Sequence, residues 1–322
     1  MSEARGANHP VGETVLEREV EGGTTRVVFD VTGPVEHPRE RVDEVLADTG
    51  VVLLRGLGVA SPERFHEVVA RFGEPLTSYR GGNTPRSKVA DGIFTSTEYP
   101  PEYEISLHNE LSYASEWPRR LFFCCLDEAD SGGATPVCDG RALLAALDPA
   151  VRERFTQRGV TYRQHLHGGF GLGKSWQQTF ETDDRAEVER FLADADMTFE
   201  WTEDGGLRTA ATRPGVRTVP DTGETVWFNQ ADQWHPSNLP PTEREALLDL
   251  YEDEADLPHS VTYGDGSPIP VADLDAVRAA AKRNELARPW RRGDVMIVEN
   301  MLALHGRHSF TGTRRVLVAM TV

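Results

Sequence analysis

The chain has 322 residues, 39% of them hydrophobic, and a formal net charge of −18. This length can bury one large core or two smaller ones. The acidic balance argues against nucleic-acid binding, which needs a cationic face, and the absence of a long apolar run argues against a membrane span. Three cysteines cannot form a paired disulfide framework, and residues 1–14 lack the apolar core of a signal peptide. We therefore expect a reduced, cytoplasmic protein.

The first half of the chain predicts short strands and helices in mixed order. Residues 1–38 form a polar lead that contains one strand at 26–31. A helix at 40–47 precedes a buried strand within 50–57, and a second helix begins after Ser61 and ends near Phe72. Strands follow at 92–97, around His108, at 120–126 and at 135–139. The glycine-rich turn between the last two predicts a hairpin.

The second half adds helices at 141–147, 149–158, 187–195, 242–254 and 270–284 and strands at 160–167, within 207–229 and from 294 to the end. Residues 168–173 carry four glycines and form a candidate lid. Many short strands with helices at the edges favour an α+β fold, mainly β, with a double-stranded β-helix (jelly-roll) core flanked by helices. We expect one domain over 1–322, with a helical insertion at about 230–290.

The strand around residue 108 carries the motif from which the functional hypothesis starts. Side chains two apart in a strand point to the same face, so an extended His108-Asn109-Glu110 aims an imidazole and a carboxylate at one point. A further histidine, His305, lies in the C-terminal run 300–307. Two histidines and one carboxylate leave three adjacent positions open on an octahedral Fe(II), as in non-haem iron oxygenases.

Four stretches together resemble the TauD/TfdA superfamily of Fe(II)- and 2-oxoglutarate-dependent dioxygenases, and within it the SyrP-like, clavaminate synthase-like branch. They are H-N-E-L-S-Y at 108–113, G-G-A-T-P at 132–136, T-G-E…W-F-N-Q at 222–230 and H-G-R…F-T-G…R-R within 300–319. The resemblance covers about 40–322. It implies that His108, Glu110 and His305 bind Fe(II), and that 2-oxoglutarate and O2 are co-substrates. The usual acid of the family is aspartate, and Glu110 resembles the variant of the clavaminate synthase-like branch.

The buried far carboxylate of 2-oxoglutarate needs a bidentate cation, which arginine supplies. Arg314 and Arg315 point to opposite faces of the last strand, so only one can point inward, and the resemblance assigns that position to Arg315. In taurine-type members the arginine lies about four residues later, where this chain has Ala319. By resemblance alone, Thr135 adds a hydroxyl donor to the co-substrate.

Candidate substrate contacts come from loops and strand ends. Arg80, Asn83 and Arg86 lie on a polar loop that precedes the metal motif, and loops over a barrel mouth often hold the substrate. A solvated loop is the competing interpretation. His165 and His167 form a second same-face pair, for which a structural role at a strand end competes with a substrate contact at His167. Asn229, at the end of a predicted strand, is the last candidate.

These patterns predict an oxygenase that hydroxylates an unactivated C–H of a polar small molecule. The resemblance suggests an amino acid, free or bound to a carrier protein, in specialised metabolism such as antibiotic biosynthesis. Because related halogenases replace the acid by glycine or alanine, Glu110 argues against halogenation. Desaturation and cyclisation use the same oxidant and stay open, as does the oligomeric state. The rival hypotheses are a catalytically silent jelly-roll binding protein and a zinc hydrolase with the same three ligands.

Overall fold

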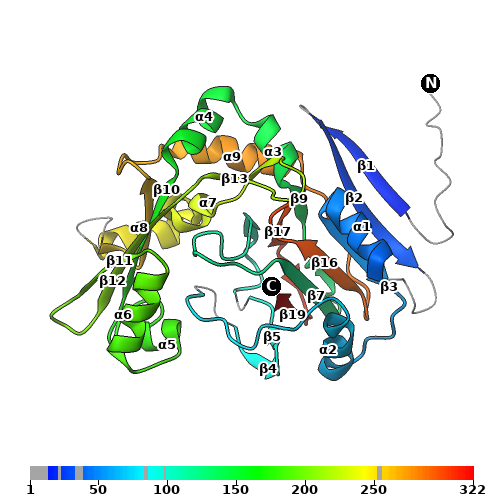
Figure 1. Ribbon diagram of the computed structural model, residues 1–322, viewed down its shortest axis with the longest axis horizontal. Helices are drawn as coiled ribbons and strands as arrows, with labels where there is room; N and C mark the ends of the chain where they lie inside the picture. Colours follow the sequence, from blue (N-terminus) through cyan, green and yellow to red (C-terminus); the bar gives the residue numbers. More distant parts are fainter. Residues whose placement is uncertain (1–13, 21–22, 33–38, 83–85, 98, 252–255) are drawn as a thin grey trace.

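The computed structural model describes residues 14–20, 23–32, 39–82, 86–97, 99–251 and 256–322 (Figure 1). Its largest sheet runs in the order β1-β2-β3-β16-β7-β19-β5-β4 over this part of the chain. Neighbouring strands are antiparallel except β2 and β3, which are parallel. The strands are β1 (Thr14–Val20), β2 (Gly23–Thr32), β3 (Val51–Arg55), β4 (Lys88–Ala90), β5 (Ile93–Thr95), β7 (Arg120–Asp127), β16 (Val295–Glu299) and β19 (Arg315–Thr321).

A smaller antiparallel sheet faces the inner side of the large one. It consists of β6 (Ile105–His108), β17 (Ala303–Arg307) and β9 (Val137–Asp139), with β17 in the middle. One buried cluster contains Phe123 and Val318 from the large sheet and Val137 and Leu304 from the small one. Two sheets that share a core in this way form the predicted jelly-roll core, which is confirmed.

Two helices cover the outer face of the large sheet, α1 (Arg39–Thr49) and α2 (Pro62–Ala70) (Figure 1). Their apolar side chains pack with Ile297 and Leu317 in a second buried cluster. The helix α2 begins as predicted, because the hydroxyl of Ser61 accepts a hydrogen bond from the Arg64 N–H and Pro62 occupies the first turn. Both faces of the central strands are therefore buried.

A four-stranded sheet outside the jelly roll, which we call the second sheet, lies at the left of Figure 1. Its order is β11 (Thr198–Trp201), β12 (Leu207–Arg213), β10 (Val160–Leu166) and β15 (His259–Tyr263). The helices α5 (Trp176–Phe180) and α6 (Arg185–Asp194) pack on one face of it through a cluster that contains Leu166, Leu207 and Leu192. This sheet forms a wall opposite the metal motif.

The predicted helical insertion at about 230–290 is only partly helical. It contains α7 (Ala231–Trp234), a 3-10 turn (Pro236–Asn238), α8 (Pro241–Asp249) and α9 (Val271–Arg283), but also the strand β15, which pairs with β10. The segment thus completes the second sheet. The remaining elements are α3 (Gly140–Ala146), α4 (Pro149–Arg158), β8 (Ser131–Gly132), β13 (Val216–Thr218), β14 (Thr225–Trp227) and β18 (Phe310–Thr311).

The predicted hairpin between residues 120–126 and 135–139 is wrong. β7 pairs with β16 and β19 in the large sheet, whereas β9 pairs with β17 in the small one. The glycine turn at Gly132 and Gly133 therefore carries the chain from one sheet to the other. Both glycines have a φ of 70°, a left-handed conformation that glycine adopts without strain.

The three cysteines, Cys124, Cys125 and Cys138, are free and buried. Among the described residues, no helix combines the length and the apolar character that crossing a bilayer requires.

Candidate metal centre

His108, Glu110 and His305 meet at the inner face of the small sheet. His108 ends β6 and lies directly opposite His305 on β17, and the two rings are 4.3 Å apart between centroids. Glu110 Oε2 lies 3.6 Å from His305 Nε2. The three side chains are buried, and each offers one ligand atom such that all three lie within 4.8 Å of one another. Side chains nearly two hundred positions apart therefore converge on one point.

Glu110 reaches this point by a different route from the predicted one. β6 ends at His108, and Glu110 stands in a turn rather than on an extended strand. The next residue, Leu111, has a φ of 53°, which is left-handed and unusual for a residue with a side chain. The turn, not the alternation of a strand, brings the carboxylate next to the imidazoles.

Two buried asparagines hold this turn. Asn300 Oδ1 accepts a hydrogen bond from the Glu110 N–H at 2.8 Å, and its Nδ2 donates to the carbonyls of Glu110 and Pro118, each at 2.9 Å. Asn109 Nδ2 in turn donates to the Asn300 carbonyl at 2.7 Å. Because buried backbone groups must be paired, these amides determine where the Glu110 backbone lies.

The ionisation states of the site fit a divalent metal. Burial and the neighbouring His305 lower the pKa of His108 to about 3, so its ring is neutral at physiological pH. Burial alone would raise the pKa of Glu110, but Arg86 and the two histidines hold that pKa well below its usual value. A neutral imidazole beside an ionised carboxylate is the donor state that Fe(II) requires.

Neighbouring groups also hold the Nδ1 side of the His108 ring, which points away from the other two ligands. Its Nδ1 lies 2.9 Å from the carbonyl oxygen of Ser106 and 2.9 Å from Gln233 Nε2. An Nδ1–H that donates to this carbonyl leaves the Nε2 lone pair for the metal and sets the orientation of the ring. The residues present therefore fit an iron ion.

Arg314 and Thr135 stand in the same small cavity as the two histidines. Arg314 Nε donates to the Gly133 carbonyl at 2.8 Å, and its two terminal nitrogens lie 3.4 Å from the hydroxyls of Ser96 and Thr135. Burial and the nearby Arg307 lower the pKa of Arg314 to about 10, which keeps it charged at neutral pH. No described carboxylate forms an ion pair with it. A buried cation with hydroxyls around it suits the carboxylate of a ligand.

The assignment of the inward position to Arg315 is wrong. Arg315 is exposed, whereas Arg314 is half-buried and lines the cavity. Val316, Val318 and Met320 belong to the inner cluster of the jelly roll, and Arg314, which directly precedes β19, lines the cavity that the two histidines line. Arg315 is the first residue of β19 and its side chain is exposed.

Arg86 is a direct partner of the metal motif rather than a residue of a solvated loop. Its Nη2 lies 2.8 Å from Glu110 Oε2, and both side chains are 3% exposed. The Tyr79 O–H donates to the other oxygen, Glu110 Oε1, and the Arg86 guanidinium lies 5.0 Å above the Tyr79 ring. Both oxygens of the carboxylate are thus oriented by side chains from the loop that precedes the motif.

Tyr79→Phe is expected to weaken Fe(II) binding by about tenfold, since removing a partner of a metal ligand costs about 10- to 100-fold in affinity. The ring stays, and only the hydroxyl on Glu110 is lost. An anaerobic Fe(II) titration measures the effect. The matched control is Tyr103→Phe, which removes a similar hydrogen bond between a tyrosine and Glu243 at the surface. Equal affinities in the two variants would contradict the role of Tyr79.

The other substrate candidates lie in different surroundings. Arg80 forms an ion pair with Glu187 at 3.0 Å and lines a larger cavity next to the metal centre. Asn83 lies outside the described residues. Asn229 uses its amide to bond the backbone of Gly215 and Ala231 and lines a cavity behind β6. His167 accepts a hydrogen bond from the Gly169 N–H, and alternation along β10 turns it away from the cavity. The structure does not bring Asn229 or His167 to the metal motif.

Sequence reasoning missed Tyr79, Gln233 and Asn300 as supporting residues. Asn300 could have been noticed, because a polar residue between two apolar strand segments must be satisfied by a buried partner. Tyr79 and Gln233 approach the site from segments about thirty and more than a hundred positions away, and no local pattern marks them.

A mostly antiparallel jelly roll that brings two imidazoles and one carboxylate together, with an arginine in the cavity that the two imidazoles line, defines a non-haem iron dioxygenase that uses 2-oxoglutarate. The sequence profile described as "Taurine catabolism dioxygenase TauD, TfdA family" matches residues 18–321. The chain belongs to this family, and the predicted enzyme class and cofactors, Fe(II), 2-oxoglutarate and O2, are confirmed.

Several known proteins are similar over most of their length. The dapdiamide synthesis protein DdaC of Enterobacter agglomerans is 36% identical over 284 residues, which cover 88% of this chain and 84% of DdaC. A clavaminate synthase-like protein of Arabidopsis thaliana is 32% identical over 298 residues, with 90% and 86% covered. The crystal structure of PvcB from Pseudomonas aeruginosa has a TM-score of 0.56 at 18% identity and covers 100% of this chain and 95% of PvcB. This last likeness supports the fold.

Proposed function

We propose that the chain hydroxylates an unactivated C–H of a small molecule built from an amino acid. The observation that carries the proposal is the group of three metal-binding side chains, two of which, His108 and His305, line one small cavity together with the half-buried Arg314. A bound iron, with 2-oxoglutarate and O2, would supply the oxidant for hydroxylation: one oxygen atom would go to the substrate, and 2-oxoglutarate would become succinate and CO2. The residues of the chain hold these groups and position the substrate beside them.

In this proposal, His108, Glu110 and His305 hold the iron. Arg314, with the hydroxyls of Thr135 and Ser96, binds the far carboxylate of 2-oxoglutarate. The fork of the guanidinium matches a carboxylate, and burial strengthens the pair. Arg307 cannot take this role as easily, because it already donates to the carbonyls of Tyr99, Pro100 and Tyr103.

The kind of substrate is supported by the relatives. DdaC is a protein of dapdiamide synthesis, which places a 36% identical enzyme in a biosynthetic pathway. We infer a role in specialised metabolism and a substrate derived from an amino acid, either free or bound to a carrier protein.

The test is a screen of amino acids, free and bound to a carrier protein, for substrate-stimulated release of succinate in the presence of Fe(II), 2-oxoglutarate and O2. A product with one added oxygen atom supports hydroxylation. A product that has lost two hydrogens would replace it by desaturation or cyclisation. Turnover that does not depend on O2 would favour the zinc hydrolase, and binding without any turnover would favour the silent binding protein.

A further inference from the structure

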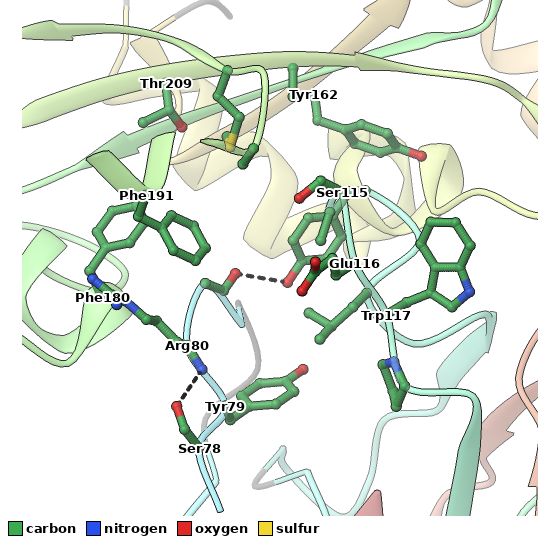
Figure 2. A pocket seen from close by; sticks show the side chains of 18 of the residues that line it. Ser78, Tyr79, Arg80, Ser115, Glu116, Trp117, Tyr162, Phe180, Phe191 and Thr209 are labelled. Atoms are coloured by element: carbon green, nitrogen blue, oxygen red, sulfur yellow. Dashed lines mark hydrogen bonds between the residues drawn. The ribbon is translucent and has the colours of Figure 1, made fainter. Parts of the chain in front are cut away.

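A cavity of about 250 Å³ lies between the second sheet and two loops next to the metal motif (Figure 2). We call it the aromatic cavity, because rings from several elements line it. Those labelled in Figure 2 are Tyr79, Trp117, Tyr162, Phe180 and Phe191. A dry cavity of about 150 Å³ lined by apolar side chains is large enough to bind benzene. The aromatic cavity therefore has room for a six-membered ring with a short chain attached.

The buried part of the cavity lining is mostly apolar or aromatic. It includes Leu111, Phe180, Ala195, Ala211, Trp234 and Met320. Two polar residues, Gln164 and Thr209, also lie there, but Gln164 Nε2 and Thr209 Oγ1 are covered by protein atoms and cannot be reached from the cavity. The inner wall is therefore poor in hydrogen-bonding groups that a ligand could use.

Three tyrosines are among the described lining residues, and protein groups already engage the hydroxyl of each. The Tyr79 O–H donates to Glu110 Oε1, and the Tyr162 hydroxyl accepts from a backbone N–H at 2.8 Å. The Tyr113 O–H donates to the Gly81 carbonyl at 3.4 Å. These hydroxyls are therefore committed to the protein, and the rings are what a ligand would contact. Such rings favour apolar and aromatic partners.

The mouth of the cavity has the opposite character. The loop of residues 76–81 contributes Ser78 and Arg80 to it, and the loop of residues 111–118 contributes Ser115 and Glu116. Arg80 is partly exposed and the other three residues are exposed, which places them at the solvent side of the lining. Arg80 and Glu116, both labelled in Figure 2, are of opposite charge. A ligand with an apolar end inside and a charged end at the mouth, as in an amino acid with an apolar side chain, suits this distribution.

The aromatic cavity adjoins the metal centre. Tyr79 joins the two, because it lines the cavity and its hydroxyl binds Glu110 Oε1. Leu111 also lines the cavity and directly follows Glu110 in the chain. A group that fills the cavity would therefore lie beside the metal-binding carboxylate.

We propose that this cavity binds a large apolar side chain of the substrate, of about the size of a phenylalanine or leucine side chain. The polar end of the substrate remains at the mouth. This inference rests on the proposed function, because it names the substrate class of the same site. It narrows the substrate to an amino-acid derivative with a large apolar side chain, and it departs from the sequence-based expectation of a polar small molecule.

The test is calorimetric titration of L-phenylalanine, L-alanine and L-glutamate into the full-length protein with 2-oxoglutarate and with Mn(II), which replaces Fe(II) to prevent turnover. L-Phenylalanine and L-alanine differ only in the phenyl ring. We expect L-phenylalanine to bind at least about tenfold more tightly, because full burial of its side chain contributes at least this factor. L-Glutamate should bind no more tightly than L-alanine, because burial of its second carboxylate against an apolar wall is unfavourable.

Ala211→Leu and Ala195→Leu each fill part of the cavity from a different element. Both are expected to lower the affinity for L-phenylalanine to that for L-alanine, and thermal unfolding identifies which of the two variants is folded. The matched control is Ala210→Leu, the same change at the neighbouring residue of β12. Ala210 lies on the opposite, partly exposed face of that strand, so its variant should keep the affinity for L-phenylalanine.

The proposal is overturned if L-alanine or L-glutamate binds as tightly as L-phenylalanine, if none of the three binds, or if the preference for L-phenylalanine persists in the folded filled variants. Binding of L-phenylalanine without succinate release from any amino acid, once Fe(II) and O2 are supplied, would instead contradict the proposed function. Succinate release that is stimulated only by amino acids with small or charged side chains would contradict the cavity assignment and leave the proposed function intact.

Discussion

Replacing His108 by alanine is expected to lower 2-oxoglutarate-dependent succinate formation by at least about a hundredfold. Loss of a mere partner of a metal ligand already costs about 10- to 100-fold in metal affinity, and His108 supplies a ligand atom itself. Glu110→Gln, which keeps the shape of the side chain but removes its charge, should have a similar effect. Anaerobic Fe(II) titration and a succinate assay measure the two consequences separately.

Glu110→Gln needs a folding control that His108→Ala does not. Removal of the negative charge leaves Arg86 buried without its ionic partner, and breaking a buried pair in this way costs about 3–5 kcal/mol. Thermal unfolding should therefore accompany every assay of this variant. The control for the histidine is His308→Ala, since His308 lies three residues after His305 but bonds Glu285 at 2.8 Å. Full turnover by iron-stripped His108→Ala protein would rule out the metal assignment.

Arg314→Ala is expected to raise the KM for 2-oxoglutarate by about 10- to 100-fold, because a hydrogen bond to a charged group contributes about 1.5–3 kcal/mol. The maximal rate should fall less, since the far carboxylate does not react. Initial rates at varied 2-oxoglutarate measure both quantities. Arg314→Lys should recover only part of the loss, because an ammonium group cannot match both carboxylate oxygens.

Arg315→Ala is the matched control for this experiment. The two residues are adjacent and of the same type, but Arg315 is exposed and Arg314 lines the cavity. The KM of the Arg315 variant should equal that of the unchanged protein. A raised KM in Arg315→Ala together with an unchanged KM in Arg314→Ala would show that the last strand faces the other way in solution.

The metal motif could be predicted from sequence because two of its three ligands, His108 and Glu110, are close together in the chain. Two ligands within three residues, together with a distant H-G-R run, restricted the possibilities, and the three side chains do converge. The reason given for the convergence was only half right. His108 lies on a strand as expected, but the strand ends there, and Glu110 is placed by a turn that Asn300 holds from the other end of the chain.

The choice between Arg314 and Arg315 could not be made from pattern alone. Strand β19 is buried on both faces, between the inner cluster and the helical layer, so its sequence does not alternate between polar and apolar residues. Without this alternation, the sequence does not show which residues of the strand point inward. The predicted hairpin between β7 and β9 was wrong for a related reason. The true partner of each strand lies more than 150 residues away in the sequence.

The cavity was also beyond sequence reasoning. His165 and His167 drew attention to β10 because histidine is chemically conspicuous, yet the buried face of that strand carries Tyr162, Gln164 and Leu166. Gln164 comes to line the cavity only because β12 pairs with β10 and Thr209 lies opposite it.

Leu111, whose backbone is left-handed, separates the aromatic cavity from the metal-binding carboxylate. Leu111 is 9% exposed and lines the aromatic cavity directly after the residue that would hold the metal. A side chain in this conformation carries about 1–2 kcal/mol of strain that glycine would not have. A glycine here would enlarge the cavity beside Glu110, and the relief of backbone strain would offset part of the lost packing. Changes in substrate size during evolution or engineering can therefore start at one residue with little harm to the scaffold.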